Sequence, residues 1–275
     1  MYPWREFDLI AGTSTGGLLA IMLGRLRMSI DECEAAYAQL ATDIFTPRRH
    51  RANFLGQSVD FLKANGKFDE QPLEKNLKNN IKDAGLDEEE FLHDMRADSP
   101  KVSFGDLADV KIWEAGRATS AASTFFDPIT IGQNGERFAD GAIHYNNPIR
   151  LVLQESYALW PTGERLLISI GTGSAPGKAI DSSLLNLVNQ LVHIATETEK
   201  TAREFLLDHE DMVKADRLFR FNVYHGLGDI GLDESKEIEQ ISARTRTYLR
   251  DPEVTRKAIA CVSAMRELRG ASLSL

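Results

Sequence analysis

The residues with the clearest chemical potential are a serine between two glycines, in the order Gly12-Thr13-Ser14-Thr15-Gly16. An apolar run precedes this G-x-S-x-G pattern and a helix-forming run follows it, which is typical of a nucleophile elbow between a strand and a helix. Gly12 and Gly16 are expected to leave room where the two backbones approach. The N–H groups that open the helix, beginning with that of Thr15, would stabilise negative charge developing beside Ser14. A plain glycine-rich turn or an anion-binding loop is the alternative interpretation.

A serine hydroxyl is a poor nucleophile until a base accepts its proton. Asp140 is one candidate base, since it follows a short apolar strand and precedes Gly141, which places its carboxylate at a sheet edge or in a loop. A carboxylate with an ordinary pKa near about 4 is a weak base, so such a dyad needs burial that raises the pKa. An ordinary Asp-Gly turn explains the same pattern equally well.

A three-residue relay through a histidine is the other arrangement. Its candidates are His93, His144, His193, His209 and His225. His225 follows a predicted strand and would keep the Ser, Asp, His order of α/β-hydrolases. Those enzymes place several strands before the elbow, whereas this sequence has one, so we expect a structural role for each histidine.

The composition of the chain limits the classes of function that it can have. Hydrophobic residues make up 43% and charged residues 27% of 275 residues, with no polar linker, so we expect a single domain over residues 1–275. The net charge of −9 disfavours nucleic acid and anionic lipid as general partners. No run approaches the roughly 20 apolar residues that span a bilayer. Cys33 and Cys261 lack metal-type spacing and predict buried free thiols in a reducing, cytoplasmic setting. No cofactor or metal site is indicated, and the oligomeric state stays open.

Helices and strands are expected to alternate along the chain. A capping box, Ser29 to Glu32, starts a helix over about residues 30–45. Further helices are predicted over 72–84, 112–122, from Asn147-Pro148 to 159, over 183–209 and 234–249, and from Asp251-Pro252 onward. Strands are predicted over 7–11, 102–104, 137–139, 165–170 and 218–223. This alternation predicts an α/β fold with a central, mostly parallel sheet sandwiched by helices in three layers. Residues 45–70 are a candidate cover over the site.

Four separated motifs, in order and approximate spacing, resemble those of the patatin-like phospholipases. They are Gly12-Thr13-Ser14-Thr15-Gly16-Gly17, Ala118-Thr119-Ser120-Ala121-Ala122 with Phe125-Phe126, Asp140-Gly141-Ala142 with Asn146-Asn147-Pro148, and Ile168-Ser169-Ile170-Gly171-Thr172-Gly173. The resemblance covers nearly the whole chain. It implies a calcium-independent lipid acyl hydrolase, a carboxylic ester hydrolase that cleaves phospholipids or neutral lipids. Ser14 would be the nucleophile and Asp140 its base, without a metal or other cofactor.

The sequence also departs from the family pattern. Family members carry, well before the elbow, a first strand and a glycine-rich loop whose N–H groups form most of the oxyanion hole. This sequence begins just ahead of the elbow run, and each missing donor would lower turnover by roughly 10²–10³. A catalytically impaired relative or fragment that acts by binding lipid or a partner is therefore the alternative hypothesis.

Peripheral membrane contact would use apolar residues such as Phe54, Leu55 and Phe61.

Overall fold

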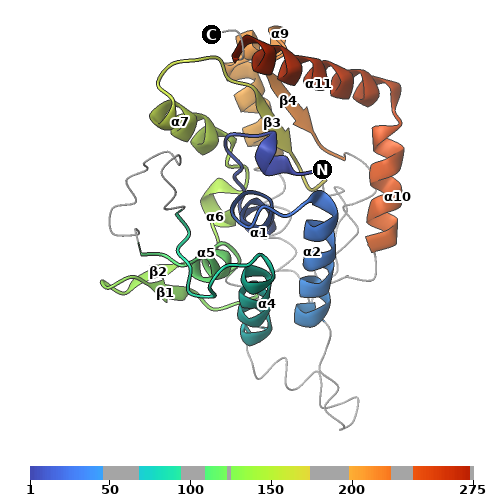
Figure 1. The fold of residues 1–275 in the computed structure, drawn as a ribbon. Coiled ribbons are helices and arrows are strands. Elements are labelled where there is room, and N and C mark those ends of the chain that lie inside the picture. The colour runs from blue at the N-terminus through green and yellow to red at the C-terminus, as the bar shows by residue number, and fades with distance from the viewer. Residues whose placement is uncertain (46–67, 94–108, 123–124, 174–197, 224–237, 273–275) are drawn as a thin grey trace. The chain divides into compact units, whose positions relative to one another are not determined.

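The computed structural model describes residues 1–45, 68–93, 109–122, 125–173, 198–223 and 238–272 (Figure 1). These residues form two compact units, Met1–Pro148 and Ile149–Leu275, and each unit is described by itself. Several predictions fall outside the described residues: Phe54, Leu55 and Phe61, nearly all of the candidate cover, the strand over 102–104, His193 and His225.

The first unit is mainly helical. Its elements are the 3-10 turn η1 (Pro3–Arg5), α1 (Thr15–Ala20), the π-helical η2 (Ile21–Arg25), α2 (Ile30–Phe45), α4 (Gln71–Asp83), α5 (Ile112–Thr119), β1 (Ile129–Ile131), β2 (Glu136–Phe138) and α6 (Ala142–Tyr145). α2 begins as predicted, because the Ser29 N–H donates to Glu32 Oε2 at 2.7 Å and the Glu32 N–H to Ser29 Oγ at 3.2 Å. The sequence did not predict β1, which pairs antiparallel with β2.

The core of this unit forms where α4 packs against both α2 and α5 and where α5 packs against α1. One face of α4, carrying Leu73, Leu77 and Ile81, is buried because these residues recur every fourth position. Leu18 of α1 and Met22 of η2 are also buried in the core. The helical segment that follows the elbow is therefore held in place by the residues that it buries in the core.

The predicted strand over residues 7–11 is wrong for the described structure. These residues adopt no strand, and no described strand pairs with them. A strand exists only when its N–H and C=O groups bond to a neighbouring strand, which an apolar run cannot guarantee by itself.

The second unit contains a parallel strand pair with helices on both faces. Its elements are α7 (Ile149–Leu159), β3 (Leu167–Ile170), helical residues 198–208, α9 (Glu210–Lys214), β4 (Leu218–Phe221), α10 (Ile238–Leu249) and α11 (Pro252–Ser272). β3 and β4 pair from Leu167 opposite Leu218 to Ile170 opposite Phe221. Leu218 packs with Phe205 and α7, whereas the next residue, Phe219, packs with Cys261 of α11. Successive side chains of a strand point to opposite faces, so helices cover both faces of this pair.

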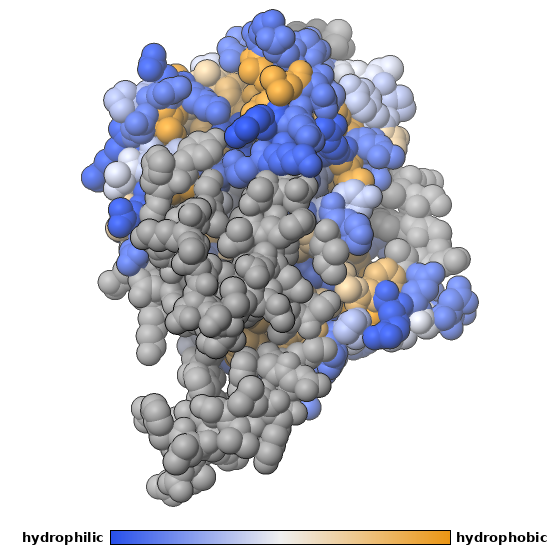
Figure 2. Space-filling model, turned by 180° about the vertical axis from the view of Figure 1, so that it is seen from behind, coloured by the Kyte–Doolittle hydropathy of each residue, from blue (hydrophilic) through white to orange (hydrophobic). Residues whose placement is uncertain are grey.

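The described strands make two separate pairs, one antiparallel and one parallel, so the predicted central sheet is not seen as one sheet. Cys33 and Cys261 are buried and unbonded, which confirms the predicted free thiols. No helix in the described ranges is both long and apolar enough to cross a bilayer. Figure 2 shows a described surface that is largely hydrophilic, with apolar residues in small separate patches.

Candidate active site

Ser14 lies at the tight turn that leads into α1. Its φ of 57° and ψ of −126° are unusual for a residue with a side chain and cost on the order of 1–3 kcal/mol. Its carbonyl oxygen accepts hydrogen bonds from the N–H groups of Gly17 at 2.9 Å and Leu18 at 3.1 Å. The helix therefore begins directly after the serine, and the Ser14 side chain stays half-exposed.

The two glycines of the elbow differ in what they make possible. A Cβ at position 12 would lie 2.1 Å from both the carbonyl carbon and the carbonyl oxygen of Gly16. A Cβ at position 16 would meet nothing within 4 Å. Gly12 must therefore be a glycine, because any side chain there would clash with the backbone of Gly16. The expectation that Gly16 also needs to lack a side chain is wrong, because a Cβ at Gly16 would point into open space.

Asp140 follows β2 by two residues and is 3% exposed. Its N–H donates to the Ala121 carbonyl at 2.9 Å, and its Oδ1 accepts from the Ala142 N–H at 2.8 Å. Its second carboxyl oxygen, Oδ2, is buried without a hydrogen-bond partner. Burial raises the pKa of Asp140, while the Ser14 hydroxyl and the Ala142 N–H oppose that rise. The Ser14 hydroxyl therefore lies close enough to the Asp140 carboxyl to influence its pKa.

Two threonine hydroxyls hold the elbow to its surroundings, and sequence reasoning assigned neither of them a role. Thr13 Oγ1 donates to the Tyr145 carbonyl at 2.6 Å, and Thr119 Oγ1 to the Ser14 carbonyl at 3.4 Å. A Cβ at Gly17 would lie 2.3 Å from Thr119 Oγ1, so the end of α5 approaches α1 closely. The sequence signals were the place of Thr13 in the Gly12–Gly17 motif and that of Thr119 in the Ala118–Ala122 motif.

Thr15 supplies the first N–H of α1. This N–H has no acceptor within the described residues, as expected for the opening turn of a helix. It lies at the positive end of the helix dipole and directly follows Ser14. An anionic oxygen formed beside Ser14 would therefore find a donor at this position.

The described histidines pack against aromatic rings. His93 stacks on Phe91 with ring centroids 5.6 Å apart, and His209 in the second unit packs on Phe205 at 4.4 Å. His144 lies beside Tyr145 at 6.5 Å. Because Asp140 Oδ2 is unpartnered, no described imidazole donates to it as a triad would require. Within the described residues, no group of three His, Cys, Asp or Glu side chains could hold a metal ion.

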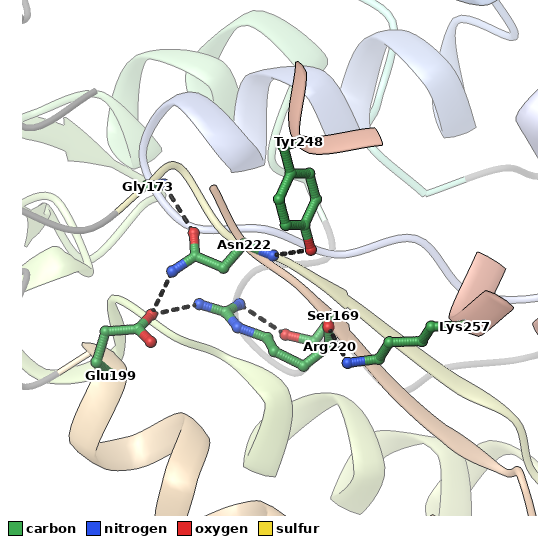
Figure 3. Close-up of polar contacts among 7 residues, drawn as sticks. All are labelled: Ser169, Gly173, Glu199, Arg220, Asn222, Tyr248 and Lys257. Atoms are coloured by element: carbon green, nitrogen blue, oxygen red, sulfur yellow. Dashed lines mark hydrogen bonds and ion pairs between the residues drawn. The ribbon is translucent and has the colours of Figure 1, made fainter. Parts of the chain in front are cut away.

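The second unit has a polar cluster of its own at the carboxyl ends of β3 and β4 (Figure 3). Glu199 Oε1 accepts from Arg220 Nη2 at 2.9 Å and from Asn222 Nδ2 at 2.8 Å. Arg220 Nη1 donates to Ser169 Oγ at 2.9 Å, and Asn222 Oδ1 accepts from the Gly173 N–H at 2.8 Å. The cluster holds the segment that directly follows β3 in place. The fourth sequence motif, Ile168 to Gly173, begins in β3 and ends in this segment.

A family model described as patatin-like phospholipase matches residues 5–153, which is more than half of the 275 residues. The chain belongs to the patatin-like phospholipase family. The matched region contains both Ser14 and Asp140, and the family fold is of the α/β class.

Individual relatives extend the match. Calcium-independent phospholipase A2-gamma from Rattus norvegicus is 29% identical over 286 residues, which cover 92% of this chain and 35% of that protein. The protein of the same name from Homo sapiens is 28% identical over 286 residues, with the same coverage. Phospholipase A I from Arabidopsis thaliana is 26% identical over 301 residues, covering 83% of this chain and 23% of that protein. The chain spans about a third or less of the length of these relatives.

Proposed function

We propose that this chain is a serine-dependent lipid acyl hydrolase that cleaves fatty-acyl esters of phospholipids or neutral lipids. The observation that carries the proposal is the strained Ser14 beside a buried carboxyl, that of Asp140, whose pKa is raised. The family membership and the names of the relatives support the substrate class. A base whose pKa is raised toward neutrality accepts a proton more readily than an ordinary carboxylate.

In the proposed reaction, Asp140 Oδ2 accepts the Ser14 proton while Ser14 Oγ attacks the acyl carbonyl carbon. The carbonyl oxygen becomes an oxyanion, and the Thr15 N–H stabilises it. The intermediate collapses to an acyl-serine ester as the leaving lipid alcohol takes the proton from Asp140. Asp140 then accepts a proton from water, which attacks the ester, and fatty acid and free Ser14 result. Every proton is returned, so the cycle balances with Ser14, Asp140, water and the substrate alone.

The fold that we propose for residues 1–275 is a single patatin-like domain with a mostly parallel central sheet between helical layers. Support comes from β3 and β4, which are parallel and have helices on both faces. Such sheets place their ligand sites at the carboxyl ends of the strands. The two buried free thiols support a reducing, cytoplasmic setting.

We also propose peripheral contact with anionic lipid through α10 and α11. Residues 238–272 carry seven basic and four acidic side chains, although the whole chain has a net charge of −9. On α11, Ile259 is 62% exposed and Val262 is 46% exposed, and the exposed Arg256 and Arg266 lie on the same helix face. A cationic face with exposed aliphatic groups suits an anionic bilayer surface.

The test is fatty-acid release from mixed phospholipid vesicles by the purified chain, with a chelator present. We expect hydrolysis by the unchanged chain and loss of it in Ser14→Ala and Asp140→Asn. Thr42→Ala and Asp83→Asn, at exposed positions, are the controls and should keep full activity. A folded chain that binds vesicles without hydrolysing them would replace this proposal with the impaired, lipid-binding alternative. Hydrolysis that survives in Asp140→Asn would exclude the dyad.

A further inference from the structure

We propose that Thr13 is a positioning residue that sets the distance between Ser14 and Asp140, an inference that rests on the proposed function. Its hydroxyl donates to the Tyr145 carbonyl at 2.6 Å. Its methyl carbon, Cγ2, lies 3.4 Å from the place that a Cβ on Gly141 would occupy. The side chain that immediately precedes the nucleophile therefore contacts the segment that immediately follows the base.

This contact reaches Asp140 through α6, the single turn Ala142–Tyr145. At the start of α6 the Ala142 N–H binds Asp140 Oδ1, and at its end the Tyr145 carbonyl receives the Thr13 hydroxyl. The last carbonyl groups of a helix have no partner within the helix, so an outside donor fixes their direction. The hydrogen bond therefore links Ser14 to Asp140 through Thr13 and α6.

A one-turn helix has little stability of its own, because nucleation is the unfavourable step of helix formation. Within α6 the N–H groups of His144 and Tyr145 both bond to the Gly141 carbonyl, at 3.1 and 2.7 Å. The Thr13 hydroxyl spans 132 positions of sequence to stabilise this turn from outside. The Ala121 carbonyl holds the Asp140 backbone separately, at 2.9 Å, so removing the hydroxyl should loosen the carboxyl without unfolding the unit.

The test compares Thr13→Val, which keeps the shape and loses the hydroxyl, with Thr13→Ser, which keeps the hydroxyl. Thr42→Val is the matched control, since Thr42 Oγ1 also donates to a helix carbonyl, that of Ala38 at 2.9 Å, on the exposed face of α2. A misplacement of about 1 Å costs roughly 10²-fold in rate, so kcat of Thr13→Val should fall roughly 10- to 100-fold with KM within about twofold. Thr13→Ser should stay within about threefold of the unchanged chain, and Thr42→Val should equal it.

Two further readouts separate positioning from a general loss of folded protein. The acid limb of the kcat–pH profile of Thr13→Val should move to lower pH, because a loosened Asp140 gains solvent and its pKa falls toward the ordinary value. Hydrogen exchange at the His144 and Tyr145 amides should quicken in Thr13→Val and stay unchanged in Thr42→Val. A lower fraction of folded molecules would reduce kcat without moving the pH limb.

Hydrogen exchange needs no turnover, so it distinguishes the failure of this inference from the failure of the proposed function. If the unchanged chain releases no fatty acid while Thr13→Val still quickens exchange in α6, the hydrolase proposal fails and the coupling stands. Unchanged exchange overturns the inference, and so does an equal kcat in Thr13→Val and an unchanged chain that hydrolyses lipid. So does a loss in Thr13→Ser as large as that in Thr13→Val, because keeping the hydroxyl would then not be enough to preserve the position of Asp140.

Discussion

Replacing Asp140 with asparagine should stabilise the first unit at neutral and alkaline pH while it removes hydrolysis. The carboxyl is 3% exposed, and one of its oxygens has no hydrogen-bond partner. A buried unsatisfied polar group costs about 1–3 kcal/mol, and more when it is charged. Asparagine has nearly the same shape and keeps an acceptor for the Ala142 N–H. Its NH2 group would lie at the unpartnered Oδ2 position, so the gain comes from removing the buried charge. We therefore expect the free energy of unfolding to rise by about 1–2 kcal/mol at pH 8.

The sign of the pH dependence follows from the raised pKa of Asp140. Below the ordinary value of 3.8 the carboxyl is protonated in both the folded and the unfolded chain, so Asp140→Asn should change stability little. As the pH rises from there through the raised folded pKa, the unfolded chain loses this proton before the folded chain does. The unchanged protein loses stability over that window by up to about 1.4 kcal/mol per pH unit. The advantage of Asp140→Asn should grow through the window and then level off.

Urea unfolding at pH 4.5, 6 and 8, followed by tryptophan fluorescence, measures this difference. Trp4 and Trp113 belong to the first unit, so a Trp160→Phe background limits the signal to that unit. The surface variant Asp83→Asn is the control for the loss of one negative charge. Asp140→Asn that is less stable at pH 8, or equally shifted at all three pH values, would refute the assignment of Asp140 as a buried, destabilised base.

Three other predictions concern single contacts. Gly12→Ala should destabilise the first unit by about 1–3 kcal/mol in urea unfolding and abolish hydrolysis, since its Cβ would lie 2.1 Å from the Gly16 carbonyl, whereas Gly16→Ala should stay folded. Glu199→Ala should cost the second unit about 3–5 kcal/mol in a Trp160-monitored unfolding curve, because it leaves the buried Arg220 guanidinium without its carboxylate; an unchanged curve would contradict the importance of that pair. Arg266→Gln should weaken sedimentation with anionic vesicles roughly fivefold and leave neutral vesicles unaffected, at about 1 kcal/mol per basic charge; equal sedimentation would place the contact elsewhere.

The helices were predictable because their signals are local. The capping box at Ser29 and a regular apolar face fixed α2 within its own residues, and proline placed the starts of α7 and α11. The strands depended on their partners. β3 followed from a nearly continuous apolar run and β4 from alternating polar and apolar residues. The run over residues 7–11, by contrast, forms no strand, and the three-residue β1 went unpredicted. Pairing is a property of two segments, so one segment alone cannot determine it.

The candidate site shows the same division. Ser14 and Asp140 were named because a serine between glycines and an aspartate before glycine are short patterns. The hydrogen bond of Thr13 joins residues 132 positions apart, and that of Thr119 joins residues 105 positions apart. The sequence around either threonine does not indicate which distant residue it binds. The raised pKa of Asp140 also arises from burial by distant segments, so the sequence could state it only as a requirement.

Backbone strain separates Ser14 from the other unusual residues of the chain. Among the described non-glycine residues, Ser14, Arg27 and Asp216 have positive φ. Arg27 lies just beyond the end of η2 and Asp216 just beyond the end of α9, where a left-handed residue is an ordinary way to terminate a helix. Ser14 lies before a helix, so termination does not explain its conformation. The strained backbone of Ser14 lies beside the carboxyl of Asp140, which has a buried oxygen without a hydrogen-bond partner. Both features lower the stability of the fold, and such unfavourable features cluster at functional sites.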